Sequence, residues 1–159
     1  MILVAIGANL PDRTGRPPLA TCRDAAEALR ALPGLRLAGI SSWHQTAAEP
    51  PSDQPDYING VVRLELLHGV CDPAALLARL QAIELQAGRV RGLRNAARVL
   101  DLDIIAIDDL VRASPDPVLP HPRAHLRRFV LAPLAEIAPG WVHPGLHINV
   151  KTLLDRLSC

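Results

Sequence analysis

The chain has 159 residues, of which 17 are basic and 16 are acidic, and a formal net charge of +1. This length suits one domain, and the balanced charge argues against a protein-wide attraction to nucleic acid or to an anionic membrane. Aromatic residues make up 3% of the chain, too few for a platform that stacks single-stranded bases. We therefore predict a single domain over residues 1–159 with no nucleic-acid or membrane partner.

The three cysteines and the first residues indicate the cellular compartment. Cys22, Cys71 and Cys159 are too far apart for a Cys-x-x-Cys zinc or redox site, which indicates reduced thiols. Met1 and the apolar run from Ile2 to Ile6 lack the basic start of a signal peptide and are far shorter than a membrane span. We therefore expect a cytoplasmic protein.

The first half of the chain predicts the order strand, helix, strand, strand. The apolar run Ile2 to Ile6 ends in a turn and predicts a buried strand. Apolar residues at three- and four-residue steps predict a helix from about Pro18 to Leu32. Leu35 to Trp43 and Tyr57 to Leu67 alternate enough for two strands, and the proline-bearing segment Gln45 to Pro55 predicts a long loop between them.

The second half predicts a helix, a strand and two more helices. Asp72 is a candidate N-cap for a helix that ends at Gly88, and Leu100 to Ile107 predicts a strand, followed by a short strand at Leu110 to Arg112. Two further helices are predicted over Phe129 to Ile137 and Val150 to Leu157. The resulting order is typical of an α+β fold, a ferredoxin-like α/β sandwich with a mainly antiparallel sheet and helices packed on it.

An arginine-rich segment stands directly before two acidic residues. Four arginines and no acid lie between Arg89 and Arg98, and Asp101 and Asp103 follow. In a strand, residues i and i+2 project from the same face about 6.5 Å apart, so both carboxylates would point one way and Leu102 the other. Mg²⁺ favours one or two carboxylates together with substrate phosphates, and arginines bind phosphates. The pattern therefore predicts ATP-type chemistry.

Plainer interpretations fit some of the same residues. An alternating strand with one wet face and a solvated arginine loop would give a similar pattern. The run Ile104 to Ile107, apolar on both faces, favours a sheet interior, where carboxylates need partners. Two histidine pairs at four-residue spacing begin at His121 and His143, but each contains a proline that breaks the helix such a zinc site would need.

Several different short motifs are spread along nearly the whole chain. They are Ile6 to Leu10, Ser41-Ser42 with Thr46, Asp53 to Asn59, Ile83 to Arg91, Arg98 to Ile104, Pro120-His121, Arg127 to Phe129 and Pro133 to Pro139. In this order and spacing they resemble the 6-hydroxymethyl-7,8-dihydropterin pyrophosphokinase family, which moves pyrophosphate from ATP to the pterin hydroxymethyl group in folate biosynthesis. The resemblance implies an ATP- and Mg²⁺-dependent transferase, with two ions, small-molecule substrates and a monomeric state.

The resemblance also implies roles for individual residues. Asp101 and Asp103 match metal ligands, and Arg89 and Arg98 match arginines that engage the phosphates during transfer. The implied ATP site comprises Gln81, Glu84, Arg89, Arg91, Arg98, His121 and Arg127, and the implied pterin pocket comprises Thr46, Tyr57, Asn59 and Phe129.

Three of these residues also have plainer interpretations. Glu84 would also suit a helix surface, Asn59 the end of a strand, and Phe129 a core anchor. The chemistry of the types supports the ligand interpretation, because an amide pairs with the amide-like edge of a pterin and flat aromatic faces cover a flat ring.

The chain departs from the family pattern beside the implied site. Arg94 to Arg98 reads Arg-Asn-Ala-Ala-Arg where Arg-Trp-Gly-Pro-Arg is common, so a covering tryptophan is missing. Glu49 places a charge beside the implied pterin pocket. Two alternatives therefore stay open: a paralogue that acts on a different hydroxymethyl heterocycle, and a non-catalytic nucleotide- or pterin-binding protein.

Overall fold

The computed structural model describes residues 1–47, 53–88 and 99–158. The sheet follows the order β2-β4-β1-β5 with antiparallel pairing, and β3 also pairs with β4. This is the predicted ferredoxin-like α+β arrangement. The elements are β1 (Ile2–Ala8), α1 (Pro18–Arg30), β2 (Leu35–Ile40), β3 (His44–Thr46), β4 (Tyr57–Leu66), α2 (Pro73–Gln86), β5 (Asp101–Ile107), η1 (Ala124–Leu126), α3 (Arg128–Ile137), β6 (Val142–His143), β7 (Ile148–Asn149) and α4 (Val150–Leu157).

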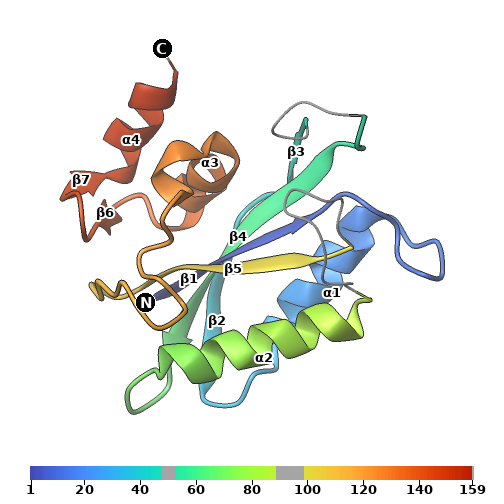
Figure 1. Cartoon of the computed structure of the whole chain (residues 1–159), viewed down its shortest axis with the longest axis horizontal. Helices are drawn as coiled ribbons and strands as arrows, with labels where there is room; N and C mark the ends of the chain where they lie inside the picture. Colours follow the sequence, from blue (N-terminus) through green and yellow to red (C-terminus); the bar gives the residue numbers. More distant parts are fainter. Residues whose placement is uncertain (48–52, 89–98, 159) are drawn as a thin grey trace.

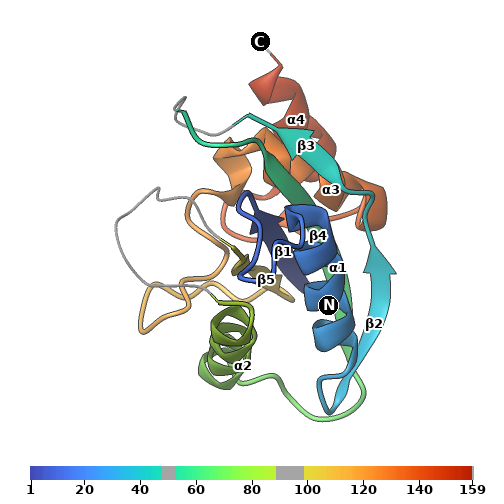
Figure 2. The same ribbon diagram turned by 90° about the vertical axis from the view of Figure 1, so that its right-hand side faces the viewer.

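Two hydrophobic layers hold the helices against the sheet. Helices α1 and α2 cover one face, and α3 covers the other with α4 packed beside it (Figures 1 and 2). The first layer buries Ile6 and Leu64 of the sheet against α1 and α2, while the second buries Val61 and Ile105 against α3 and α4. Burial of this apolar surface is the main stabilising contribution to the fold.

Local capping signals explain the helix boundaries. The Asp72 carboxylate accepts a hydrogen bond from the backbone N–H of Ala74 at 3.1 Å at the start of α2. The Oδ1 atom of Asn149 accepts a hydrogen bond from the backbone N–H of Thr152 at 2.8 Å at the start of α4. Helix α4 begins and ends where the sequence predicts. Within the described parts of the chain, no helix is both long and apolar enough to cross a membrane.

A bulge in β5 accounts for its apolar run. Val4 pairs with Ile104 and Leu3 pairs with Ala106, so Ile105 has no partner in the register. The extra residue turns both Ile105 and Ala106 toward the α3 layer, while Ile104 stays in the α1–α2 layer. The strand is therefore apolar on both faces after the bulge and alternates before it.

The strand predicted over Leu35 to Trp43 is shorter in the structure. Strand β2 ends at Ile40. Strand β3 lies beyond the predicted strand and includes Gln45 and Thr46, so the loop predicted over Gln45 to Pro55 is wrong at its first two residues. Gly60 of β4 leaves room for the ring of Trp43, because a Cβ on Gly60 would lie 2.6 Å from two of its ring atoms. The strand predicted at Leu110 to Arg112 is not formed either, since Arg112 makes only an isolated bridge.

Candidate active site

The two aspartates lie on one face of β5, as the alternation predicts. Asp101 pairs with Gly7 and Asp103 pairs with Ala5 in β1, and both aspartates are partly buried. Leu102, between them, is buried in the α1–α2 layer on the opposite face. The carboxylates therefore belong to the face that α3 covers.

Glu84 of α2 is fixed to the same part of β5. Its side chain is 5% exposed, and its Oε2 accepts a hydrogen bond from the backbone N–H of Leu102 at 2.9 Å. The interpretation of Glu84 as an ordinary helix-surface acid is therefore wrong. Gln81 lies one helical turn earlier on α2 and is partly buried, which places it on the same side of the helix.

The donor set suits Mg²⁺ better than zinc. Among the residues that the structure describes, no three His, Cys, Asp or Glu side chains are grouped so that they could hold a metal ion. Two carboxylates on one strand face fit an ion that takes its remaining oxygens from water and substrate phosphates. A zinc site would need a fuller set of protein ligands.

The histidines of the two pairs at four-residue spacing make other contacts in the structure. The rings of His125 and His143 meet edge to face with centroids 5.4 Å apart. Nδ1 of His143 accepts hydrogen bonds from the backbone N–H groups of Gly145 and Leu146, at 3.1 and 3.0 Å. That nitrogen is committed to the β6–β7 turn and is not free to bind metal.

His121 stands beside the aspartate face as a neutral hydrogen-bond donor. Its backbone N–H donates to the Ile105 carbonyl at 2.8 Å, which holds it at the edge of β5. Burial, assisted by Arg127 and Arg123, lowers the pKa of His121 to about 4 against an opposing effect of Asp101. Nδ1 accepts from the Arg123 N–H at 3.1 Å, so in the neutral ring the proton is on Nε2. Such a group donates to a phosphate oxygen at neutral pH.

Arg127 and Phe129 meet at the start of α3. The Arg127 guanidinium carbon lies 5.5 Å from the centroid of the Phe129 ring, which is a cation–π distance. Phe129 also packs, partly buried, on the hydrophobic layer beneath α3. Both predicted roles of Phe129 are therefore compatible with its place: it anchors the helix and presents a flat face beside an arginine.

The sheet brings three of the predicted pterin-pocket residues together. Thr46 of β3 pairs with Tyr57 of β4, and the Asn59 Nδ2 group donates to the Thr46 hydroxyl at 2.8 Å. Asn59 is 7% exposed, and a Cβ on its partner Gly7 would lie 3.0 Å from the Asn59 Oδ1 atom. Gly7 therefore makes room for the amide of Asn59.

One row of the sheet connects the two halves of the site. His44, Asn59, Gly7 and Asp101 follow one another across β3, β4, β1 and β5. Paired residues in antiparallel strands share a face, and adjacent strands lie about 4.8 Å apart, so Asn59 and Asp101 are separated by about 10 Å on the α3 side. Gly7 itself adds no side chain between them, and the amide oxygen of Asn59 lies over its position.

Asn9 is an organising residue that sequence reasoning did not single out. Its side chain is 1% exposed, and its Nδ2 group donates to Gln54 Oε1 and to the Pro55 carbonyl, both at 3.1 Å. These bonds hold the segment that leads into Tyr57. The sequence offers Asn9 only as part of the Ile6 to Leu10 motif, since its partners are more than forty positions away.

Several predictions lie outside the described residues. Arg89, Arg91 and Arg98 belong to the segment 89–98, and Glu49 belongs to 48–52. Their proposed roles therefore remain predictions. So does the consequence of the Asn-Ala-Ala sequence at positions 95–97.

Sequence comparisons identify the family. The family model described as 7,8-dihydro-6-hydroxymethylpterin-pyrophosphokinase (HPPK) matches residues 3–139. A 2-amino-4-hydroxy-6-hydroxymethyldihydropteridine pyrophosphokinase of Synechocystis is 37% identical over 157 residues, which is 99% of this chain and 76% of that protein. A protein of the same name from Pseudomonas aeruginosa is 39% identical over 148 residues, covering 92% of this chain and 86% of its own length.

Solved structures agree on the fold. A triple-mutant HPPK-DHPS of Plasmodium falciparum has a TM-score of 0.71 and 12% identity over 98% of this chain. This chain spans 44% of that one, so it corresponds to part of a longer protein there. Taken with the motifs and the row of site residues, the family match shows that this chain belongs to the 7,8-dihydro-6-hydroxymethylpterin-pyrophosphokinase family.

Proposed function

We propose that this chain, acting as one domain, transfers pyrophosphate from ATP to the hydroxymethyl group of 6-hydroxymethyl-7,8-dihydropterin. The products are AMP and the pterin diphosphate, as in folate biosynthesis. The observation that supports this most directly is the row from Asn59 through Gly7 to Asp101, with an amide at one end and a carboxylate at the other. The separation of about 10 Å suits a two-ring acceptor whose reactive arm reaches toward the metal ligands.

The carboxylates of Asp101 and Asp103 are proposed as ligands of two Mg²⁺ ions. Mg²⁺ bound there would neutralise phosphate charge and orient the triphosphate. The protein's own contribution is a fixed pair of oxygen donors on one strand face, held in place by the bond between Glu84 and Leu102. Gln81 and Glu84 of α2 are proposed to border the nucleotide.

Cationic and neutral donors would complete the phosphate site. His121 would donate a hydrogen bond from its Nε2–H group to a phosphate oxygen, and Arg127 would add positive charge from the start of α3. Arg89, Arg91 and Arg98 are proposed to neutralise the charge on the transferred and departing groups. The pterin hydroxyl oxygen would then bond to the β-phosphorus as the bond from that phosphorus to the α,β-bridging oxygen breaks. AMP would leave with the bridging oxygen, and the hydroxyl proton would pass to solvent.

The end of the site around Asn59 would bind the pterin ring. Asn59 presents both a donor and an acceptor, which matches the amide-like edge of a pterin. Thr46, bonded to Asn59, fixes the orientation of that amide. Tyr57 from β4 and Phe129 from α3 offer apolar faces from two different layers of the fold.

The direct test is AMP formation with purified protein, ATP, Mg²⁺ and the dihydropterin. AMP that requires both the pterin and the metal supports the proposal. The Asn-Ala-Ala sequence at positions 95–97 and the charge of Glu49 favour one second candidate, a paralogue with a different hydroxymethyl acceptor. A panel of hydroxymethyl heterocycles separates the two, and ATP binding without turnover of any acceptor would indicate the binding-only alternative.

A further inference from the structure

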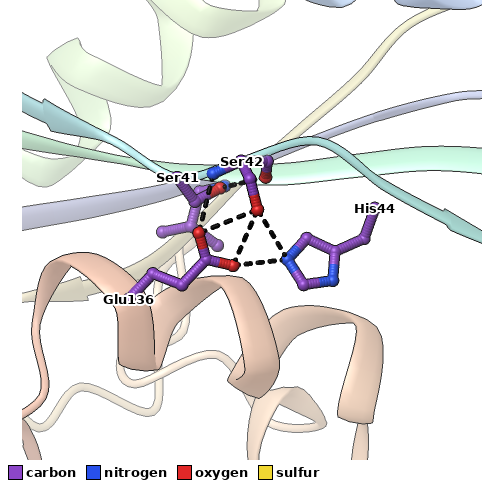
Figure 3. Close-up of polar contacts among 5 residues, drawn as sticks. Ser41, Ser42, His44 and Glu136 are labelled. Atoms are coloured by element: carbon purple, nitrogen blue, oxygen red, sulfur yellow. Dashed lines mark hydrogen bonds and ion pairs between the residues drawn. The ribbon is translucent and has the colours of Figure 1, made fainter.

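A polar cluster ties β3 to the end of α3. The Glu136 carboxylate accepts hydrogen bonds from the backbone N–H and the hydroxyl of Ser42, both at 2.8 Å, and lies 2.5 Å from the Nε2 atom of His44 (Figure 3). The Ser42 hydroxyl is also 3.3 Å from the same ring nitrogen. Three of these contacts join Glu136 to residues more than ninety positions earlier in the sequence.

The electrostatics of the cluster favour an ionised glutamate. Desolvation alone would raise the pKa of the Glu136 carboxyl, but the hydrogen bonds from Ser42 and His44 lower it below its ordinary value. The side chains of His44 and Glu136 are 30% and 37% exposed, so solvent screens the pair only in part. The cluster is therefore an exposed contact in which hydrogen bonds are made to an ionised carboxylate.

The cluster is not a hydrolytic triad. In such a triad the carboxylate contacts one imidazole nitrogen and the serine hydroxyl contacts the other. Here Ser42 and Glu136 both contact Nε2 of His44, so the histidine is not oriented to take a proton from the serine. The geometry points to a structural connection, not to a nucleophile.

The place of this connection gives it a consequence for the site. Strand β3 has only three residues, and within it His44 pairs with Asn59 while Thr46 pairs with Tyr57. Three of these residues, Thr46, Tyr57 and Asn59, belong to the predicted acceptor pocket. Glu136 lies in the last turn of α3, the helix whose first turn carries Phe129. The cluster therefore joins the strand wall of the pocket to its helical wall.

We propose that Ser42, His44 and Glu136 act as positioning residues for the pterin: their contacts hold β3 against α3 and so fix the Thr46 hydroxyl that orients Asn59. This inference rests on the proposed function, because it names the pterin as the ligand. A short strand released from the helix would have to be reordered each time the acceptor binds, and that cost appears as weaker acceptor binding. The nucleotide residues on α2 and β5 would be unaffected, and Arg127 lies at the opposite end of α3 from Glu136.

The experiment compares matched variants of the full chain. His44→Phe keeps a strand-forming ring but removes the polar contact, and Glu136→Gln keeps the shape but removes the charge. Glu27→Gln serves as the control, because it removes a similar exposed pair with Arg30 on α1, on the other side of the sheet. We expect His44→Phe and Glu136→Gln each to raise the pterin Kd about fivefold, with the ATP Kd and kcat changed less than about twofold.

Two further measurements separate positioning from general stability. His44→Gln retains a side-chain donor for Glu136 and should restore most of the pterin affinity, and the double variant should be little worse than either single one. Amide hydrogen exchange should be faster at β3 and at the facing residues of β4 in His44→Phe, without any ligand present. The control variant should show neither change.

Each contrary outcome has a distinct meaning. Unchanged exchange at β3 in His44→Phe would overturn the inference, because the cluster would then not hold the strand. Faster exchange with an unchanged pterin Kd would overturn it as well, since the position of β3 would not matter to the acceptor. A wild-type protein that does not bind the pterin would instead contradict the proposed function and the ligand named here, while the exchange comparison would still decide whether the cluster holds β3.

Discussion

The carboxylate of Glu84 accepts a hydrogen bond from the backbone N–H of Leu102 at 2.9 Å. Leu102 lies between Asp101 and Asp103 in β5, which is at one end of the sheet order. An amide on the outer side of such a strand has no neighbouring strand to bond, so a helix side chain takes that place. The bond fixes α2 to β5 at the level of the proposed metal ligands.

Removal of this acceptor should destabilise the protein. Glu84→Ala leaves a buried amide without its partner, which costs about 1–3 kcal/mol in the free energy of unfolding. Glu84→Gln keeps a carbonyl acceptor and should recover most of that loss. Urea denaturation of the three proteins measures the difference, and an alanine variant as stable as the wild type would contradict the role of this bond.

Asp103→Ala should abolish transfer while the fold is retained. The side chain is partly buried on a strand that is held by pairing with β1, so little packing is lost. Loss of a metal ligand removes several kcal/mol of transition-state stabilisation, a rate decrease on the order of a thousandfold. Turnover and thermal unfolding of Asp103→Ala are compared with Asp109→Ala, an exposed acid in the turn after β5. An undiminished rate would remove the metal assignment.

Gly7→Ala should weaken acceptor binding. The added Cβ would lie 3.0 Å from the Asn59 Oδ1 atom, so the amide must shift from its present position. Loss of one well-placed hydrogen bond corresponds to about a tenfold rise in the pterin Kd. Gly140→Ala is the control, because a Cβ there meets nothing within 4 Å. Equal pterin affinity for both variants, measured by titration, would show that Asn59 does not depend on the space at Gly7.

The low pKa of His121 predicts a particular loss of stability in acid. Burial and the nearby arginines lower the pKa to about 4, from 6.5 for an unperturbed histidine. Between these values the unfolded chain binds a proton that the folded chain does not, so this contribution is complete above pH 6.5 and is lost as the pH falls toward 4. The free energy of unfolding of His121→Gln should therefore fall less steeply over this range.

The contribution of His143 to the pH dependence of stability cancels when the wild type is compared with His121→Gln. Burial, together with His125 and His147, lowers the pKa of His143 as well, and that contribution is the same in both proteins. Urea denaturation at several pH values gives the two slopes. Parallel slopes for wild type and His121→Gln would contradict the assignment of a neutral, partly buried His121.

Local signals account for what the sequence predicted well. The Asp72 cap and the apolar period predicted α2, and the alternation around Leu102 predicted that Asp101 and Asp103 share a face. These features depend on residues a few positions apart. The phosphate-binding roles of the arginines in the segment 89–98 rest on composition and on the family resemblance, and these roles remain predictions.

Long-range contacts account for what the sequence did not predict. Strand β3 is a strand because it pairs with β4 and bonds to Glu136, ninety-two positions from His44. The role of Asn9 depends on Gln54, forty-five positions away. The bulge at Ile105 arises from the register with β1 and has no local signature. In each case the deciding partner is distant in sequence, beyond the reach of a periodicity argument.

The central claim is pyrophosphate transfer to the dihydropterin, and AMP formation measures it most directly. Purified protein is incubated with ATP and Mg²⁺, with and without 6-hydroxymethyl-7,8-dihydropterin. We predict AMP and pterin diphosphate in equal amounts, and neither product when the pterin or Mg²⁺ is omitted. ATP binding without AMP formation in the complete mixture would contradict the claim.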